Sequence, residues 1–379
     1  MTSPLAREIK ALIASEGPIS LARYMDLCLG HPRYGYYMTR DPFGAGGDFI
    51  TAPEISQMFG ELLGLWVLAA WQQMGCPDPI HLVELGPGRG TLMADALRAC
   101  RLMPAFGDAA RIHLVEMSPV LRARQQATLS QVASAHPLSW HARLEDVPDG
   151  PVLVLANEFF DALPISQFIR SGGGWHERRI GLDPAGDLTF GVDPHPARLV
   201  DRLARHVPLP HPPGVLLERL ESPAAAALAT RLTTQDGAAL VIDYGHAISG
   251  FGDTLQAIKA HAFVDPLATP GEADLTAHVD FAALARSSVA AGAQAFGPVP
   301  QGEFLLRLGL AARAERLQAG ASPAQAEQIA IAAARLTGTG AKEMGTLFKV
   351  LCLAGPAFAA SGDPPPGFAP SEAFAENTP

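Results

Sequence analysis

Short, unbroken apolar runs alternate with amphipathic stretches from residue 80 onward. The apolar runs are IHLVEL (80–85), RIHLVEM (111–117), PVLVLA (151–156) and AALVIDYG (238–245). The amphipathic stretches RGTLMADALRAC (89–100) and SPVLRARQQATL (118–129) predict helices between the runs. Strands without polar alternation are buried on both faces. The pattern therefore predicts an α/β fold, with a mostly parallel sheet covered by helices on both faces.

A helical pattern precedes this core, over residues 1–75. It predicts helices over 4–15, over 20–30, and from near Pro53 to Gly75. Because this segment comes before the first core strand, we expect it to fold over the core as an N-terminal helical lid.

The core itself is expected to span residues 76–355. SQFIRSGGGWHERRIGL predicts a hairpin around Gly172–Gly174, so residues 165–215 are expected to form a β-insertion. Residues 303–338 are rich in alanine and predict helices, and GTLFKVLCLAG predicts a last strand at 345–355. The proline-rich tail, residues 356–379, is predicted to be disordered.

Composition narrows the class of protein. Of 379 residues, 48% are apolar and 17% charged, which allows a large core and excludes global disorder. There are 38 acidic residues against 28 basic ones, giving a net charge of -10. Because proteins that bind nucleic acid usually carry a basic face, the balance argues against a nucleic-acid partner.

The cysteines and the apolar runs bear on location. None of the four cysteines forms a C-x-x-C pair, so we expect neither a metal site nor disulfides, and a cytoplasmic location. The most apolar run, GLWVLAAW (64–71), is too short to cross a bilayer, and we expect no membrane contact. Only four lysines accompany abundant alanine, glycine and proline, a bias typical of GC-rich bacterial genes.

The strongest chemical signal is VELGPGRGTL at residues 83–92. Gly86, Gly88 and Gly90 lie between a predicted strand and a helix, where glycine lets a ligand approach the backbone. Their G-x-G-x-G spacing differs from the nicotinamide fingerprint, because Thr91 stands where that motif needs its third glycine. With Glu84 before it, the loop resembles the S-adenosylmethionine loop of class I methyltransferases.

Two further segments extend the predicted cofactor site. Glu116 ends the next strand, where a carboxylate can accept both ribose hydroxyls of an adenosine. In SWHARLEDVP (139–148), Leu144 is a candidate to pack on the adenine, and Glu145 or Asp146 to reach it. The alternative interpretation is a generic α/β turn with solvated acids.

Longer strings resemble one particular family. GDFITAPEIS (47–56), VELGPGRGTL (83–92), NEFFDALP (157–164), VIDYG (241–245), DLTAHVDF (274–281) and MGTLFKVL (344–351) are similar to the MidA-like methyltransferases, which are related to a mitochondrial complex I assembly factor. The resemblance covers nearly everything from Pro18 to Leu353. It implies a class I, Rossmann-like fold and S-adenosylmethionine as cofactor.

The resemblance also implies an activity. The mitochondrial member symmetrically dimethylates an arginine of a complex I subunit, so we expect a protein arginine methyltransferase with a protein substrate, which a respiratory complex I subunit would fit. One alternative is a small-molecule methyltransferase. Another is a non-catalytic assembly factor that binds S-adenosylmethionine and uses the β-insertion as its working surface. That insertion is also a candidate surface for self-association.

Within GDFITAPEIS, Gly47 offers an unusual backbone position, and Asp48 or Thr51 is placed to bond the methionyl end of the cofactor. Thr51 has a second interpretation as a helix N-cap, with Glu54 completing a capping box.

The candidates for acceptor chemistry follow the later strands. Asn157, Glu158 and Asp161 lie in NEFFDALP, after the strand that faces the transferred methyl group in class I methyltransferases. Asn157 is also assigned to the cofactor. Asp243 ends the next strand, and His278 and Asp280 lie in DLTAHVDF. If residues 158–161 were helical, Glu158 and Asp161 would share one face. The alternative is that Asn157 and Asp161 form turns and that His278 is structural.

Overall fold

In the computed structural model, residues 3–42, 51–132, 137–340, 343–360 and 362–375 are described. The chain divides into two compact units. The α/β unit consists of residues 50–159, 223–247 and 281–379, and the β-rich unit of residues 1–49, 160–222 and 248–280.

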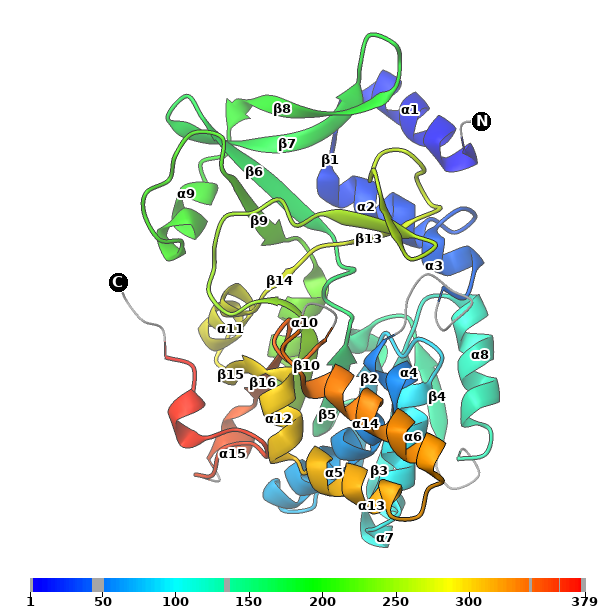
Figure 1. Cartoon of the computed structure of the whole chain (residues 1–379). Coiled ribbons are helices and arrows are strands. Elements are labelled where there is room, and N and C mark those ends of the chain that lie inside the picture. The colour runs from blue at the N-terminus through cyan, green and yellow to red at the C-terminus, as the bar shows by residue number, and fades with distance from the viewer. Residues whose placement is uncertain (1–2, 43–50, 133–136, 341–342, 361, 376–379) are drawn as a thin grey trace. The chain divides into compact units, whose positions relative to one another are not determined.

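The α/β unit is built on a mostly parallel sheet (Figure 1). Its strand order is β15-β16-β10-β5-β2-β3-β4. The strands are β2 (Ile80–Leu85), β3 (Ala110–Val115), β4 (Leu138–His141), β5 (Val152–Asn157), β10 (Gly237–His246), β15 (Gln294–Pro300) and β16 (Phe348–Ala354). Strands β4, β3, β2, β5 and β10 pair in parallel, whereas β15 and β16 are antiparallel to their neighbours. The expected parallel α/β core is thus confirmed.

Helices surround this sheet. They are α4 (Ala52–Ile55), α5 (Gln57–Gln73), α6 (Thr91–Cys100), α7 (Pro104–Ala109), α8 (Pro119–Leu129), η1 (Leu144–Asp146), α10 (Pro223–Gln235), α11 (Phe281–Ala290), α12 (Gln301–Arg307), α13 (Leu310–Gln318), α14 (Pro323–Thr337), α15 (Pro356–Ala359) and η3 (Pro370–Glu372). The predicted helical character of 303–338 is confirmed by α12, α13 and α14.

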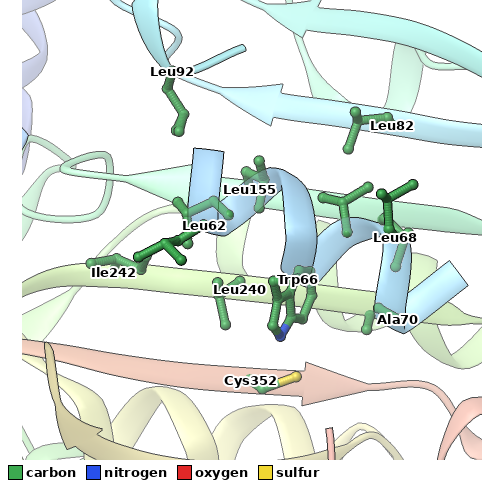
Figure 2. Close-up of a cluster of buried hydrophobic side chains, with 14 of the residues drawn as sticks. Leu62, Trp66, Leu68, Ala70, Leu82, Leu92, Leu155, Leu240, Ile242 and Cys352 are labelled. Carbon is green, nitrogen blue, oxygen red and sulfur yellow. The ribbon is translucent and has the colours of Figure 1, made fainter. Parts of the chain in front are cut away.

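The core of this unit lies between α5 and the sheet. Figure 2 shows Trp66 pointing from α5 toward strands β10 and β16, beside Leu240 and Cys352. Trp66 is fully buried. Gly64 lets α5 approach α6 closely, because a Cβ there would lie 2.5 Å from the carbonyl oxygen of Ala96.

The expected long helix from Pro53 to Gly75 is wrong in one respect, since it is broken at Ser56. Ser56 has an extended backbone, with φ -160° and ψ 136°, and its side chain accepts a hydrogen bond from the amide of Met58. It therefore ends α4 and caps α5. A serine is favoured at such a cap because its oxygen satisfies an amide that has no partner inside the helix.

The predicted disorder of the tail is also wrong, over residues 362–375. Phe368 is buried, and Trp66 Nε1 donates to the carbonyl oxygen of Pro366 at 3.1 Å. Arg307 forms an ion pair with Glu372 at 2.7 Å. Proline-rich composition predicted disorder, but a few apolar and charged side chains hold the segment to the α/β unit.

The β-rich unit contains the predicted hairpin. Strand β6 (Ile165–Ser171) pairs antiparallel with β7 (Gly174–Leu182), which confirms the turn around Gly172–Gly174. The sheet has the order β1-β7-β6-β9, with β8 beside β7, where β1 is Ile19–Ser20, β8 Leu188–Pro196 and β9 Leu216–Leu220. A second sheet has the order β12-β11-β13, with β11 Gln256–Lys259, β12 Ala262–Val264 and β13 Asp274–Thr276, and β14 is Val279–Asp280.

Helices α1 (Pro4–Glu16), α2 (Leu21–Gly30) and α3 (Tyr36–Thr39) share a core with the hairpin sheet, and α9 (Val200–Leu203) and η2 (Ala204–His206) belong to a second, smaller core. All four cysteines are free thiols. Over the ranges described above, no helix is both long and apolar enough to cross a membrane.

Candidate functional site

The glycine-rich loop joins β2 to α6 at the carboxyl edge of the sheet. Gly86, Gly88 and Gly90 have φ of 63°, 51° and 82°, in the left-handed region that side chains with a Cβ rarely adopt. A Cβ on Gly86 would also lie 2.9 Å from Phe159 Cδ2. The three glycines are therefore required by the shape of the loop.

Glu84 lies on β2 just before this loop and is 3% exposed. Burial raises the pKa of its carboxyl to about 8, partly offset by a hydrogen bond from the backbone of Met93 in the first turn of α6. Within the described ranges, its Oε2 atom has no hydrogen-bond partner. A buried carboxyl oxygen without a partner is suited to a cationic group of a ligand, which would favour the ionised form of Glu84.

Glu116 follows the last residue of β3. Strands β2 and β3 run parallel with Leu85 opposite Val115, so Glu116 lies at the same sheet edge as the glycine loop. Its Oε1 accepts from the amide of Ser118 at 2.8 Å, and its Oε2 accepts from Gln125 Nε2 at 3.2 Å. Burial raises the pKa of Glu116, and these donors favour the charged form.

The segment around Thr51 meets the glycine loop. Thr51 is the N-cap residue of α4, but its side chain makes no capping bond, so the capping-box interpretation is wrong. Glu54 instead accepts a 2.6 Å hydrogen bond from Thr91 Oγ1 and lies 3.8 Å from Arg89 Nη1. The carboxylate that was expected to close a local box thus ties α4 to the loop. Gly47 and Asp48 lie outside the described residues.

The segment after β4 carries the other adenine candidates. Leu144 is buried in the short helix η1. Asp146 accepts from the amide and the guanidinium of Arg143, at 3.1 and 3.3 Å. Glu145 is exposed. Of these three, Leu144 is the one that offers a buried apolar surface.

Asn157 is the last residue of strand β5, and Glu158 follows it. The amide of Ala52, at the start of α4, and Asn157 Nδ2 both donate to Glu158 Oε1, at 3.1 and 3.3 Å. Glu158 has φ of +50°, a strained value for a residue with a Cβ. Such strain is retained where the surrounding structure holds the residue in place, often at functional sites.

Asp243 lies beside this strand end. Strands β5 and β10 run parallel with Asn157 opposite Ile242, so Glu158 and Asp243 each follow a paired residue at the same edge. Asp243 is fully buried, and its Oδ1 accepts from the amide of Tyr244 at 2.9 Å.

The comparisons with known proteins point to one family. The profile of the family described as "Putative S-adenosyl-L-methionine-dependent methyltransferase" matches residues 62–299. A Drosophila melanogaster protein named protein arginine methyltransferase NDUFAF7 homolog, mitochondrial, is 42% identical, over 92% of this chain and 84% of its own length. The human protein arginine methyltransferase NDUFAF7, mitochondrial, is 38% identical, over 82% of this chain and 74% of its own length.

The chain belongs to this methyltransferase family.

A solved structure supports the same assignment to the methyltransferase family. A Burkholderia thailandensis protein, crystallised with S-adenosyl-homocysteine, has a TM-score of 0.81 and 31% identity, over 98% of this chain and 95% of its own. The protein is an S-adenosylmethionine-dependent methyltransferase with the family's α/β fold. The orphaned Glu84 oxygen and the glycine loop fit this cofactor, which carries an ammonium group.

Asp161 and His278 of the methyltransferase belong to the β-rich unit, whereas Glu158 and Asp243 belong to the α/β unit. The carbonyl oxygen of Asp161 accepts from the amide of Ala277, and the amide of His278 donates to Thr254 Oγ1, both at 2.9 Å. Residues 158–161 form no helix, so the predicted shared helical face is wrong. The positive φ of Glu158 turns the chain out of β5 instead.

Two further residues contribute to the site of the methyltransferase, and the sequence did not indicate this role for either. Gln125 bonds both Glu116 and the glycine loop, and Thr91 bonds Glu54. The sequence gives no signal for either role, because glutamine on a helix and threonine at a helix start are common. Only the packing of α8 and α4 against the loop reveals them. Within the described part of the chain, no group of three or more His, Cys, Asp or Glu side chains is arranged so that it could hold a metal ion.

Proposed function

We propose that this methyltransferase transfers a methyl group to an arginine side chain of a protein. The proposal rests on the 42% identity, over 92% of the chain, to a relative named as a protein arginine methyltransferase. The carboxylates of Glu158 and Asp243 at neighbouring strand ends support it, since they suit a cationic acceptor.

The cofactor would be held by residues of the α/β unit. Glu84 would bond its ammonium, Glu116 its ribose hydroxyls, and Leu144 would pack on its adenine. Gly86, Gly88 and Gly90 would let the cofactor approach the backbone of the loop. Thr51 and Asn157 would border its methionyl end. The cofactor supplies an electrophilic methyl group on a sulfonium.

The acceptor residues would act through charge placement. An arginine guanidinium stays protonated at neutral pH and delocalises its charge, which makes each nitrogen a poor nucleophile. Carboxylates that bond two of its nitrogens leave the third richer in electrons. We assign the first carboxylate to Glu158 and the second to Asp161 or Asp243, with His278 as a candidate proton acceptor.

The finer features follow the family resemblance. The product would be symmetric dimethylarginine, and the substrate would be a subunit of respiratory complex I in the cytoplasm of a bacterium. Of residues 1–75, only the part before α5 would act as a lid, because α5 belongs to the core of the α/β unit. The insertion at 165–215 would be the surface that meets the protein substrate or a second copy of the chain.

The test is methyl transfer into a lysate from a strain that lacks the gene, because the natural acceptor there is unmethylated. Radiolabelled S-adenosylmethionine and the purified protein should label a protein band. Acid hydrolysis of that band should release labelled symmetric dimethylarginine. A Gly88→Val variant is the matched control and should label nothing.

Two results would contradict the proposal. Label confined to the small-molecule fraction would indicate a small-molecule methyltransferase. Cofactor binding without any label would support a non-catalytic assembly factor.

A further inference from the structure

Gln125 is a fully buried glutamine on α8, and its side chain has three polar partners. Its Nε2 donates to the carbonyl oxygen of Gly88 at 2.8 Å and to Glu116 Oε2 at 3.2 Å. Its Oε1 accepts from Trp140 Nε1, on β4, at 2.9 Å. One side chain thus joins the glycine loop and the ends of β3 and β4.

The chemistry of the partners permits one orientation of this amide. An indole N–H only donates, so Oε1 must face Trp140. A carbonyl and a carboxylate only accept, so the NH₂ group must face Gly88 and Glu116. The three contacts agree, and rotating the amide by half a turn would break all of them.

Glu116 depends on donors for its charged state. Ribose hydroxyls bind best to an ionised carboxylate, because it accepts without competing as a donor. Gln125 and the amide of Ser118 each donate to one of its oxygens. Arg122, whose Nε donates to the carbonyl oxygen of Glu116 at 2.7 Å, also favours the charge.

We propose that Gln125 is a positioning residue that fixes Glu116 relative to the glycine loop and thereby sets the recognition of the cofactor's ribose. This inference rests on the proposed role of Glu116 in binding the ribose hydroxyls. Gln125 itself does not contact the reacting atoms. Its effect is to hold the carboxylate and the Gly88 backbone in one arrangement before the cofactor binds, which lowers the ordering cost of binding.

The test compares Gln125→Glu with Gln126→Glu. Both change an amide to a carboxylate on α8, but Gln126 is exposed. Affinities for adenosine and 2′-deoxyadenosine are measured by calorimetry at several pH values, with thermal unfolding as a check of folding. The ratio of the two affinities reports recognition of the ribose hydroxyl.

We expect Gln125→Glu to weaken adenosine binding at pH 7.5 about tenfold or more, the scale of one hydrogen bond to a charged group. Binding of 2′-deoxyadenosine should fall much less, so the ratio falls toward one. Lowering the pH protonates the new carboxyl and restores one donor, so discrimination should partly return. Gln126→Glu should match the wild type.

Gln125→Met keeps the length of the side chain without a charge. It should lose discrimination at every pH, without recovery in acid. Wild-type ratios in both Gln125 variants, equal losses for both nucleosides, or failure of both variants to fold would overturn the proposal and make Gln125 a packing residue.

Glu116→Ala distinguishes the proposed ribose role of Glu116 from the positioning role of Gln125. If Glu116→Ala keeps full discrimination, the proposed ribose role of Glu116 is wrong. If Glu116→Ala loses discrimination while the Gln125 variants retain it, only the inference about Gln125 fails.

Discussion

At the scale of single residues, three glutamates at neighbouring strand ends have different surroundings. Glu84 is buried with one oxygen unpaired in the described structure, whereas Glu116 has donors on both oxygens. Glu158 accepts two bonds on one oxygen and has a strained backbone. The same residue type is therefore suited to a cation, to hydroxyl donors and to a positioned charge.

Gly88 tests the glycine loop. Gly88→Ala should weaken S-adenosylhomocysteine binding at least tenfold, because alanine disfavours φ of 51° and would distort the loop. Gly172→Ala is the control, since Gly172 has φ of 55° in an open hairpin turn of the β-rich unit. Calorimetric titration measures both. Equal affinities in the two variants would show that the cofactor lies elsewhere.

Glu84 predicts a pH dependence of cofactor binding. Free Glu84 has a pKa of about 8, so it is largely protonated at pH 7. A bound ammonium favours the carboxylate, so binding releases a proton and affinity should rise with pH up to about 8. Calorimetry in buffers of different ionisation enthalpy measures the released proton. Glu84→Gln should abolish the release; a release that persists would assign the proton to another group.

Glu158→Gln tests the acceptor site. The variant keeps an oxygen for the amide of Ala52, so α4 should stay attached and cofactor affinity should be unchanged. Loss of the charge should slow transfer by about 10²-fold or more, the effect of removing one group that stabilises a transition state. Single-turnover methylation measures the rate. Turnover near the wild-type rate would leave His278 or Asp280 as better candidates.

At the scale of elements, a row of histidines crosses three strands of the sheet. His81 Nδ1 lies 2.9 Å from His113 Nε2, and His113 Nδ1 lies 2.9 Å from His141 Nε2. At the other end, His81 Nε2 bonds the carbonyl oxygen of Asp149 at 3.1 Å. Burial lowers the pKa of all three, to about 3 for His113.

This row predicts a loss of stability in acid. His113 has a pKa of about 6.5 in the unfolded chain and about 3 in the folded protein, so between these values only the unfolded chain binds the proton. The free energy of unfolding therefore falls as pH falls through this window. Between pH 7 and 5, the wild type should lose about 2 kcal/mol relative to His113→Gln.

Urea unfolding of both proteins at each pH gives this difference. Subtracting the stability of His113→Gln from that of the wild type at each pH removes the contribution of Glu84, which is present in both proteins. That contribution has the opposite sign: because the pKa of Glu84 is raised in the folded protein, its stabilising effect is complete below pH 4.5 and is lost as pH rises toward 8. The exposed His195 supplies the control, and His195→Gln should track the wild type. Parallel pH profiles for the wild type and His113→Gln would show that His113 titrates normally.

At the scale of the whole molecule, the C-terminal segment is part of the α/β unit. Phe368 is 7% exposed and packs on Phe304, with ring centroids 5.4 Å apart. Phe368→Ala should lower the free energy of unfolding by about 3–5 kcal/mol, as for other buried phenylalanines. Phe263→Ala, at a 75% exposed position, should change it by less than about 0.5 kcal/mol. Denaturant titration compares the two. Equal effects would mean that residues 362–375 contribute little to stability.

The core strands β2, β5 and β10 could be predicted from sequence because each is a continuous apolar run between turn signals. Strands β4 and β15 were not predicted. The residues of β4 are half-buried, and β15 carries a glycine and two prolines with an irregular register. Local pattern identifies strands when burial is symmetric and turns are marked; it fails at sheet edges, where neighbours decide.

The sequence by itself determined the parallel core, the glycine loop and the family, because buried strands and left-handed turns restrict which residues are allowed locally. Only the tertiary structure decided what the polar side chains do. Glu54 accepts a hydrogen bond from Thr91 instead of forming the expected capping box, and Gln125 bonds both Glu116 and Gly88. Those partners lie 37 residues apart for Glu54 and Thr91, and 37 for Gln125 and Gly88. A hydrogen bond depends on distance and direction in space, and residue spacing along the chain does not encode either over such separations.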